Sequence, residues 1–160
     1  LSAPGGKVVA FEPLPRNIGF IHRHITLNKL QDRITLIEAA VSDHSGTTFF
    51  DPDISTSKGH IADQGQLEVR LVCLDELVRT GEIPLPDVMK IDVEGAEAEV
   101  LRGARHILET RHPLLYLDTH QRTAHEQTVA ILADLGYTIA CLDGKPLPES
   151  KELIASYETG

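Results

Sequence analysis

The sequence has little of what membrane-spanning and nucleic-acid-binding proteins need. No apolar run in its 160 residues approaches the roughly 18 residues that cross a bilayer. Basic residues are outnumbered, with 15 Lys and Arg against 24 Asp and Glu, and the formal net charge is −9. Nucleic acids and anionic membranes both attract a positive protein face. We therefore expect neither a nucleic-acid partner nor membrane insertion, and the composition leaves the oligomeric state open.

Cysteine is also scarce. Cys73 and Cys141 lie far apart, each inside an apolar run. This arrangement favours buried, reduced thiols over a disulfide or a metal pair, and it fits a cytoplasmic protein. The chain shows no signal peptide and does not begin with Met, so we expect its natural start to lie upstream.

Most of the histidines lack metal-ligand spacing. We predict that they are solvated and that the protein holds no metal through them. These histidines are His22, His24, His44, His60, His106, His112 and His125.

Strand-like and helix-like segments alternate along the chain, which predicts an α/β fold with a mostly parallel, doubly wound sheet. The length suits a single domain over residues 1–160. We predict strands at 7–11, 34–37, 47–50, 67–74, 88–92, 114–118 and 137–142. We predict helices at 17–30, from Asp75 as N-cap to 79, one continuous helix through 96–108, and 124–135. Residues 51–65 read as a mobile surface loop, and residues 143–160 receive no firm structure.

Acidic residues follow several of the predicted strands. Glu12, Glu38, Asp92 and Asp118 each end a strand, and His120 follows closely. The carboxyl ends of parallel strands meet at one edge of a sheet, where ligands bind in open α/β folds. A carboxylate after the second strand of a nucleotide-binding sheet can accept two hydrogen bonds from a ribose diol.

Each of these acids also has a structural interpretation. Glu12 suits an ordinary exposed strand end, and Asp92 suits the N-cap of the next helix. Glu94 and Glu97 would then simply favour the positive end of that helix. His120 taken alone is more often a surface residue, and Lys90 can reach solvent from the face that it shares with Asp92.

A set of motifs resembles one known family in the right order over about residues 6–137. The segments are AFEPLP (10–15), Asn28, AVSD (40–43) with Gly46, LD (74–75), KIDVEGAE (90–97) and VLRGA (100–104). They are similar to the FkbM family of S-adenosylmethionine-dependent methyltransferases. The resemblance implies a Rossmann-like class I methyltransferase fold. It also implies methyl transfer from S-adenosyl-L-methionine to a hydroxyl of a small molecule or sugar.

The resemblance also implies roles for individual residues. Glu12, with Pro13 beside it, would bind the ribose of the cofactor, and Asp92 would face the methyl donor. The residues implied near the adenine are Glu38, Ala39 and Ala40.

Three residues are the catalytic candidates. Asp92 is the first choice for the base or for orienting the acceptor, His120 is the second, and Glu94 lies beside them. The mechanism requires no metal, although Asp92, Glu94 and Asp118 are an alternative set of ligands for a divalent cation.

One family feature has no counterpart. Family members begin with a strand and a glycine-rich loop of the type Asp-x-Gly-Ala-Asn-x-Gly, and the similar-looking residues 17–20 fall on a later helix. We therefore expect an N-terminally truncated domain that lacks the first strand and this loop. The strands ending at Glu12 and Asp92 would then have unpaired edges, at about 1–3 kcal/mol for each unsatisfied group. Two alternatives stay open, a non-catalytic binding module and a dinucleotide-dependent oxidoreductase.

Overall fold

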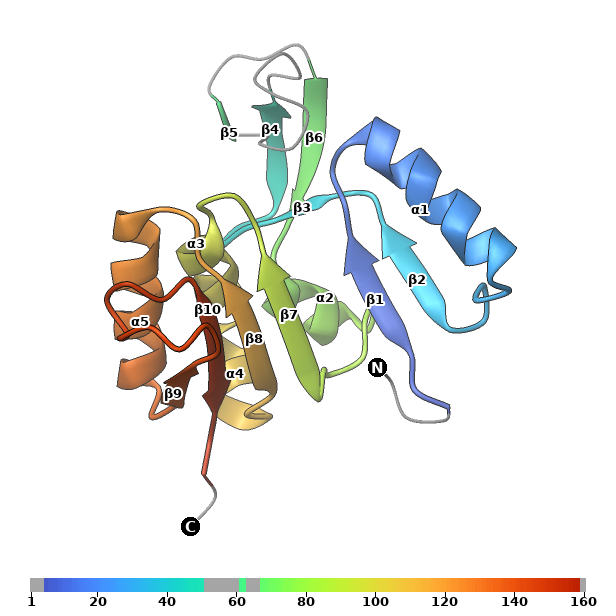
Figure 1. Cartoon of the computed structure of the whole chain (residues 1–160). Helices are drawn as coiled ribbons and strands as arrows, with labels where there is room; N and C mark the ends of the chain where they lie inside the picture. The colour runs from blue at the N-terminus through green and yellow to red at the C-terminus, as the bar shows by residue number, and fades with distance from the viewer. Residues whose placement is uncertain (1–4, 51–60, 63–66, 159–160) are drawn as a thin grey trace.

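The computed structural model describes residues 5–50, 61–62 and 67–158 (Figure 1). Its first half runs β1 (Val8–Phe11), α1 (Pro15–Leu27), β2 (Ile34–Ile37), β3 (Ala40–Val41), β4 (Gly46–Phe50), β5 (Ile61–Ala62), β6 (Leu67–Val72) and α2 (Leu74–Thr80). Its second half runs β7 (Val88–Asp92), α3 (Glu97–Arg102), α4 (Arg105–Thr110), β8 (Leu114–Asp118), α5 (Arg122–Asp134), β9 (Thr138–Cys141) and β10 (Glu152–Ser156). None of the described helices is long and apolar enough to cross a membrane.

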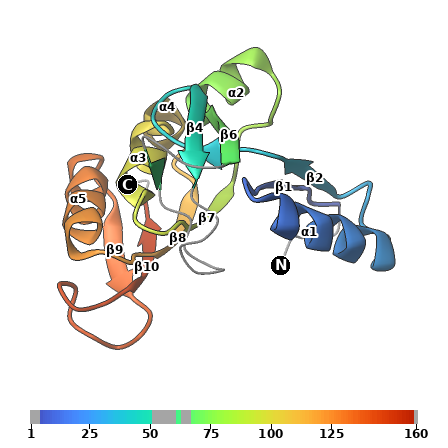
Figure 2. The same ribbon diagram turned by 90° about the horizontal axis from the view of Figure 1, so that it is seen from above.

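In the described residues the strands form three sheets. Their orders are β1-β2, β7-β8-β10-β9 and β3-β6-β4-β5. The β1-β2, β7-β8 and β3-β6 pairs are parallel, as the alternation of strands and helices predicts. The β8-β10, β9-β10, β4-β5 and β4-β6 pairs are antiparallel, so the described sheets are mixed rather than mostly parallel. Viewed from above, α1 lies on the opposite side of the strands from α3, α4 and α5 (Figure 2). The predicted α/β, Rossmann-like architecture with helices on both faces is therefore confirmed.

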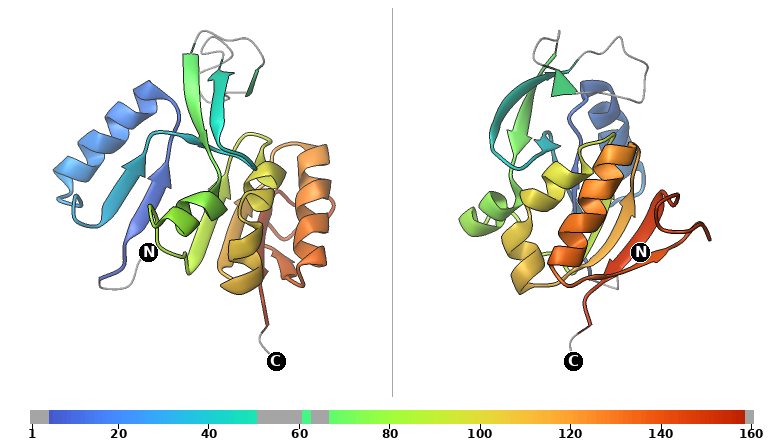
Figure 3. Two further views of the ribbon diagram at one scale, coloured as in Figure 1. Left: turned by 180° about the vertical axis from the view of Figure 1, so that it is seen from behind. Right: turned by 90° about the vertical axis from the view of Figure 1, so that its left-hand side faces the viewer.

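The core lies between the β7-β8-β10-β9 sheet and the helices behind it (Figure 3). Alternate residues of each strand point toward these helices, as the two-residue period of a strand requires. The buried strand residues are Met89, Ile91, Leu115, Leu117, Leu153 and Ala155. The opposite face of β7 carries Val88, Lys90 and Asp92, which are exposed. The sheet therefore presents an apolar face to the helices, and its opposite face mixes charged residues with apolar ones such as Val88.

The last strand is absent from the prediction, which gave residues 143–160 no firm structure. β10 runs antiparallel to both neighbours and lies between β8 and β9. Its inward side chains, Leu153 and Ala155, have no exposed surface. Three consecutive apolar residues in a five-residue strand do not alternate with polar ones, and the pairing partners lie elsewhere in the chain. The prediction was wrong here because long-range pairing, rather than local periodicity, defines the strand.

The helix predicted through residues 96–108 is broken into α3 and α4. Gly103 ends α3 because it lies against the backbone of another segment: an added Cβ would be 2.1 Å from the Ser42 carbonyl oxygen. Asp75 was predicted to cap α2, whose N-cap is in fact Cys73. The Asp75 carboxylate instead accepts hydrogen bonds from the backbone N–H groups of His106 (2.8 Å) and Ile107 (3.0 Å). It therefore caps α4, a role that only the tertiary packing reveals.

The remaining boundaries are close to the prediction. β2, β7 and β8 have the predicted limits, and β1 differs by one residue. α1 begins two residues early because Pro15 suits the first helical turn. Most of the predicted 51–65 loop lies outside the described residues, but residues 61–62 form β5, which pairs with β4. Cys73 and Cys141 are free thiols, as predicted, although Cys141 is only half-buried.

Candidate functional site

The carboxyl ends of β1, β2, β7 and β8 point toward the same edge of the molecule, at the top of these strands in Figure 1. Glu12, Glu38, Asp92 and Asp118 therefore belong to one edge, as predicted from the sequence. β1 pairs with β2, and β7 pairs with β8; within the described part of the chain β1 and β7 do not pair with each other.

His120 lies at the centre of a group of carboxylates. Its Nδ1 atom is 3.0 Å from Glu97 Oε1. Its Nε2 atom is 3.7 Å from Asp92 Oδ1 and 3.9 Å from Glu94 Oε2. About a third of the imidazole side chain (31%) is exposed, so a ligand can reach it. The structure thus brings together Asp92, Glu94 and His120, the three residues predicted to be catalytic.

The surrounding charges control the protonation of His120. Partial burial by itself lowers the pKa of the imidazole, because burial disfavours the charged form. The hydrogen bond to Glu97 and the negative charges of Glu94, Glu97 and Asp92 act in the opposite direction and prevail. The pKa of His120 is therefore raised above its ordinary value of 6.5.

Glu97 is the residue of this site that the sequence reasoning missed. It was predicted to favour the start of a helix, yet its side chain is completely buried (0% exposed). Oε1 accepts the Gly95 N–H (3.2 Å) and contacts His120, whereas Oε2 has no hydrogen-bond partner in the described residues. A sequence signal was present: Glu97 precedes Val100, Leu101 and Ala104 by three, four and seven residues, which places it on the apolar face of the helix.

Lys90 links the two strand-end aspartates. Asp92 and Asp118 are paired in register across β7 and β8, and Lys90 points to the same face as Asp92. Lys90 Nζ is 3.2 Å from Asp92 Oδ2 and donates a hydrogen bond to Asp118. Burial lowers the pKa of Lys90, but the hydrogen bonds to Asp118 and Asp92 outweigh that effect and raise it.

The cation alternative for Asp92, Glu94 and Asp118 finds no geometric support. Within the described ranges no group of three or more His, Cys, Asp or Glu side chains is placed to hold a metal ion. The Lys90 ammonium group instead lies between Asp92 and Asp118.

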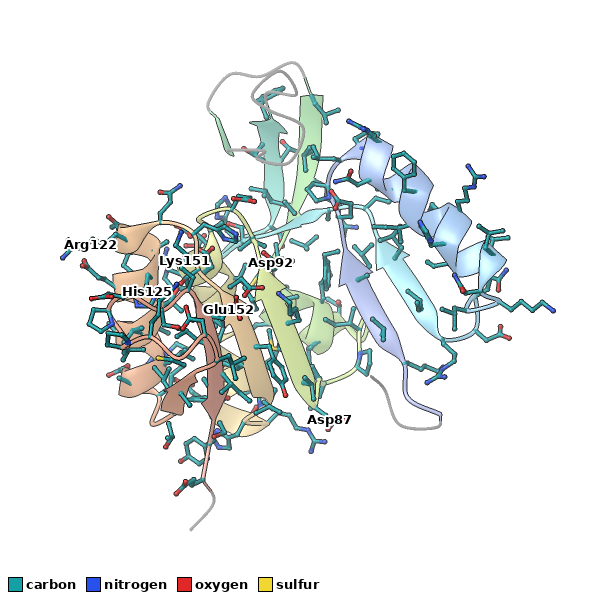
Figure 4. All side chains as sticks on the ribbon, viewed as in Figure 1. Asp87, Asp92, Arg122, His125, Lys151 and Glu152 are labelled. Atoms are coloured by element: carbon teal, nitrogen blue, oxygen red, sulfur yellow. The ribbon has the colours of Figure 1, made fainter. Side chains whose placement is uncertain are left out.

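The loop that carries His120 is held from the side of α5 and β10. The Thr119 N–H donates to the Lys151 carbonyl oxygen (2.8 Å), and Thr119 Oγ1 is 2.9 Å from His125 Nδ1. His125 was predicted to be solvated, but it is buried, and Figure 4 shows it on α5 close to Lys151. His125 connects the loop to α5 through its contact with Thr119. No pattern in the sequence predicts this contact.

Gly95, in the loop after β7, lies close to the loop after β8. Its φ of +97° lies in the left-handed region that favours glycine. A Cβ atom at this position would lie 2.6 Å from Gln121 Nε2. The Gln121 side chain could move away from an added Cβ, so the positive φ is the reason that this position of the KIDVEGAE motif favours glycine.

The predicted ribose-binding acid has a defined orientation. Glu12 Oε1 accepts a hydrogen bond from the Leu14 N–H (2.9 Å), and both Glu12 and Pro13 are half-buried. This contact fixes the carboxylate beside the start of α1.

The three predicted adenine neighbours differ in exposure. Glu38 is exposed and lies 3.5 Å from His22 Nε2. Ala39 belongs to the core and has no exposed surface, whereas Ala40 is half-buried in β3. A ligand could therefore reach Glu38 and Ala40 in this structure, but not the side chain of Ala39.

His112 also differs from the prediction of solvated side chains, whereas His44 agrees with it. His112 stacks on Tyr157 with ring centroids 3.7 Å apart, and its buried Nδ1 has no hydrogen-bond partner in the described residues. His44 is exposed but pairs with Asp43 (2.7 Å). His60 lies outside the described residues.

A hollow of about 330 Å³ opens beside the site. Its lining includes Lys90, Tyr116, Asp118, Leu142 and Glu152. It thus combines charged groups at the strand ends with apolar and aromatic side chains, which suits a small polar ligand with a carbon skeleton.

Comparison with known sequences indicates a methyltransferase relationship. A family model described as the methyltransferase FkbM domain matches residues 1–139. The hexuronic acid methyltransferase AglP of Haloferax volcanii is 31% identical over 65% of this chain and 44% of its own length. The 2-O-methyltransferase NoeI of Sinorhizobium fredii is 26% identical over 98% of this chain and 67% of its own length.

Solved structures show the same fold. The crystal structure of the methyltransferase FkbM from Methylobacillus flagellatus has a TM-score of 0.65 over 94% of this chain, at 18% identity. A precorrin-6y C5,15-methyltransferase from Geobacter metallireducens has a TM-score of 0.57 over 98% of the chain, at 20% identity. The chain spans 44% of the length of AglP and 36% of the FkbM structure.

Proposed function

The chain belongs to the FkbM methyltransferase domain family, and from this premise we propose that its protein is an S-adenosylmethionine-dependent O-methyltransferase. We propose a hydroxyl of a sugar or another small molecule as the acceptor. Two relatives support this choice through their names, hexuronic acid methyltransferase and 2-O-methyltransferase. The observation that carries the proposal is the cluster of His120, Asp92 and Glu94 at the ends of β7 and β8.

The carboxylates at the strand ends can accept hydrogen bonds, which suits the hydroxyl groups of S-adenosylmethionine. When bound, this cofactor supplies an electrophilic methyl group. Glu12 presents a carboxylate oriented by Leu14, which suits the two hydroxyls of a ribose. Pro13, Glu38, Ala39 and Ala40 belong to the same proposed binding region, with Glu38 and Ala40 as its accessible members. Asp92 is the proposed link between this region and the reacting groups.

The proton of the acceptor hydroxyl needs a base. Asp92 and His120 are the two candidates, and the contacts favour His120. Asp92 Oδ2 is already engaged by the Lys90 ammonium group (3.2 Å), whereas His120 Nε2 lies 3.7 Å or more from the carboxylates that face it, beyond hydrogen-bond distance. In this assignment His120 accepts the proton, while Asp92 and Glu94 orient the acceptor through hydrogen bonds.

Lys90 and Asp118 connect this chemistry to the neighbouring hollow. Both residues line the hollow together with Tyr116 and Leu142, and Lys90 also pairs with Asp92. An acceptor lying in the hollow would have its carbon skeleton against apolar side chains and its hydroxyls near the charged groups. We propose this hollow as part of the acceptor site.

Calorimetry and a methyl-transfer assay test the proposal. S-adenosylhomocysteine should bind the protein, and tritium should pass from S-adenosyl-[methyl-³H]methionine to D-glucuronic acid or methyl β-D-glucopyranoside as probe sugars. Asp92→Asn should lower the rate about 10²-fold, because an oriented carboxylate is lost. Asp87→Asn is the matched control: Asp87 lies at the opposite end of β7 and pairs with Arg111 (Figure 4).

The outcomes separate the alternatives. Full activity of Asp92→Asn would remove Asp92 from the proposed site. Binding of S-adenosylhomocysteine without transfer to a broad panel of hydroxyl compounds would favour a binding module.

A further inference from the structure

We propose that Glu97 is a positioning residue for His120. Its buried carboxylate accepts a hydrogen bond from the Nδ1–H group, which leaves Nε2 free to take the proton of the acceptor hydroxyl. This inference rests on the proposed function for its catalytic consequence. The arrangement itself is a property of the protein, and it can be tested without methyl transfer.

The burial of Glu97 is the first support. Glu97 has no exposed surface, and in the described part of the chain it is the one buried Asp, Glu, Lys or Arg. Burying a carboxylate is unfavourable unless hydrogen bonds compensate. Here Oε1 has two donors, Gly95 N–H and His120, while Oε2 has none among the described residues. An apolar side chain would suit this position better for stability alone, so the carboxylate has a use in the site.

The geometry of the imidazole is the second support. Nδ1 is within hydrogen-bond distance of Glu97 Oε1 at 3.0 Å, whereas Nε2 is 3.7 Å from Asp92 and 3.9 Å from Glu94. The latter distances exceed those of hydrogen bonds. A neutral imidazole carries one proton, and a carboxylate at Nδ1 places that proton there. Nε2 then has a lone pair directed toward the strand-end acids.

Both partners are held in place by the fold. Thr119 fixes the backbone before His120 through hydrogen bonds to Lys151 and His125. Gly95 donates its N–H to Glu97. The pair therefore does not have to organise when a ligand arrives, which is the basis of efficient proton transfer.

The proton balance is simple. The O–H bond of the acceptor would break, its proton would pass to Nε2, and His120 would become an imidazolium. The electron pair left on the acceptor oxygen would form the new bond to the methyl carbon, and the electron pair of the broken carbon–sulfur bond would leave with S-adenosylhomocysteine. The negative charge of Glu97 balances the new positive charge. The other charged groups that face the ring are Glu94 and Asp92, and Lys90 and Asp118 lie behind Asp92.

Nitrogen NMR of protein labelled with ¹⁵N-histidine tests the arrangement directly. His120→Gln identifies the His120 signals, and a titration between about pH 5 and 9 follows them. In the wild-type protein we expect the neutral ring to carry its proton on Nδ1. Glu97→Gln should lower the pKa of His120 and reduce the Nδ1–H population, because the charged acceptor is lost.

Glu99→Gln is the matched control. Glu99 lies on the same helix and pairs with Arg102 (3.0 Å) rather than with His120. It should leave the tautomer and the pKa of His120 unchanged. Circular dichroism melting of each variant separates loss of positioning from loss of folding. If Glu97→Gln does not fold, the wild-type tautomer decides: a proton on Nε2 would overturn the proposal.

Kinetics provide the catalytic test. With the probe sugars named above, Glu97→Gln should lower kcat about 10²-fold with little change in the KM for S-adenosylmethionine. Its pH–rate profile should shift to lower pH together with the pKa of His120. If wild-type protein methylates neither sugar, the proposed function is at fault, and the NMR result still decides whether Glu97 positions His120. An unchanged tautomer and pH profile in Glu97→Gln would refute the positioning role.

Discussion

The two ends of this molecule differ sharply in how they are held together. The region from β7 to β10 buries its side chains between a sheet and three helices. Its completely or almost completely buried residues include Leu101, Ile107, Leu108, Leu115, Leu117, Leu132 and Leu153. In the region from residue 5 to 38, which contains β1, α1 and β2, Ile25 is the one buried residue.

The difference extends to helices of equal length. α1 and α5 each have 13 residues. On α1, Phe20 and Leu27 are exposed by 51% and 68%, whereas α5 buries Ala124, Thr128 and Leu132. Regions with few buried contacts open more readily than the core.

The chemistry is divided along the same line. Glu97 is completely buried in the well-packed region, and His120 lies at the edge of that region, with about a third of its side chain exposed. Glu12 and Glu38, proposed to bind the cofactor, lie in the sparsely packed region.

Removing a core side chain should have the largest effect. Leu115→Ala leaves a cavity at a position with no exposed surface, and we expect a loss of about 2–5 kcal/mol in the free energy of unfolding. Leu27→Ala, on the exposed surface of α1, should change it by less than about 0.5 kcal/mol. Urea unfolding of both variants measures the contrast. Equal losses would show that the two regions do not differ as described.

Replacing Gly103 and Gly19 by alanine should change the free energy of unfolding by smaller amounts and in opposite directions. Gly103→Ala places a Cβ 2.1 Å from the Ser42 carbonyl oxygen, so the backbone must shift, at a cost of about 1–3 kcal/mol. Gly19→Ala meets nothing within 4 Å on α1 and should stabilise the helix by about 0.5–1 kcal/mol. Thermal melting of the two variants provides the measurement. A stabilising Gly103→Ala would contradict the close packing of α3 against residues 42–43.

The pH dependence of stability should show the smallest effect. The folded pKa of His120 is raised above 6.5, so the folded state binds the proton more tightly than the unfolded state. The resulting stabilisation is fully present below about pH 6.5 and is lost as the pH rises through the folded pKa.

A comparison of two histidine variants measures this contribution. The difference in unfolding free energy between wild type and His120→Gln should be larger at pH 6 than at pH 9. His24→Gln, on exposed α1, is the control. If this difference in unfolding free energy increased toward high pH, the carboxylates around His120 would not stabilise its protonated form.

The sequence was sufficient for the elements with strong local patterns. The apolar runs of β1, β2, β7 and β8 predicted strands near their observed limits, and the acids after them predicted a site at one edge. Asp92, Glu94 and His120 became catalytic candidates through the family resemblance of the motifs, and they lie together. These features depend on residues close together in the chain, so their patterns are readable without the fold.

Other features arise only from contacts between distant segments. Long-range pairing places β10 between β8 and β9, and packing against Ser42 ends α3 at Gly103. Asp75 caps a helix about 30 residues away, His125 holds the loop after β8, and Glu97 turns from a helix-end acid into the buried partner of His120.

The sequence by itself therefore determined the order of the elements, the edge at which the acids gather and most of the groups available there. The tertiary structure alone decided which acid touches His120 and how deeply it is buried. The physical reason is that hydrophobic periodicity depends only on residues close together in the sequence, whereas the environment of a carboxylate depends on every segment that packs around it.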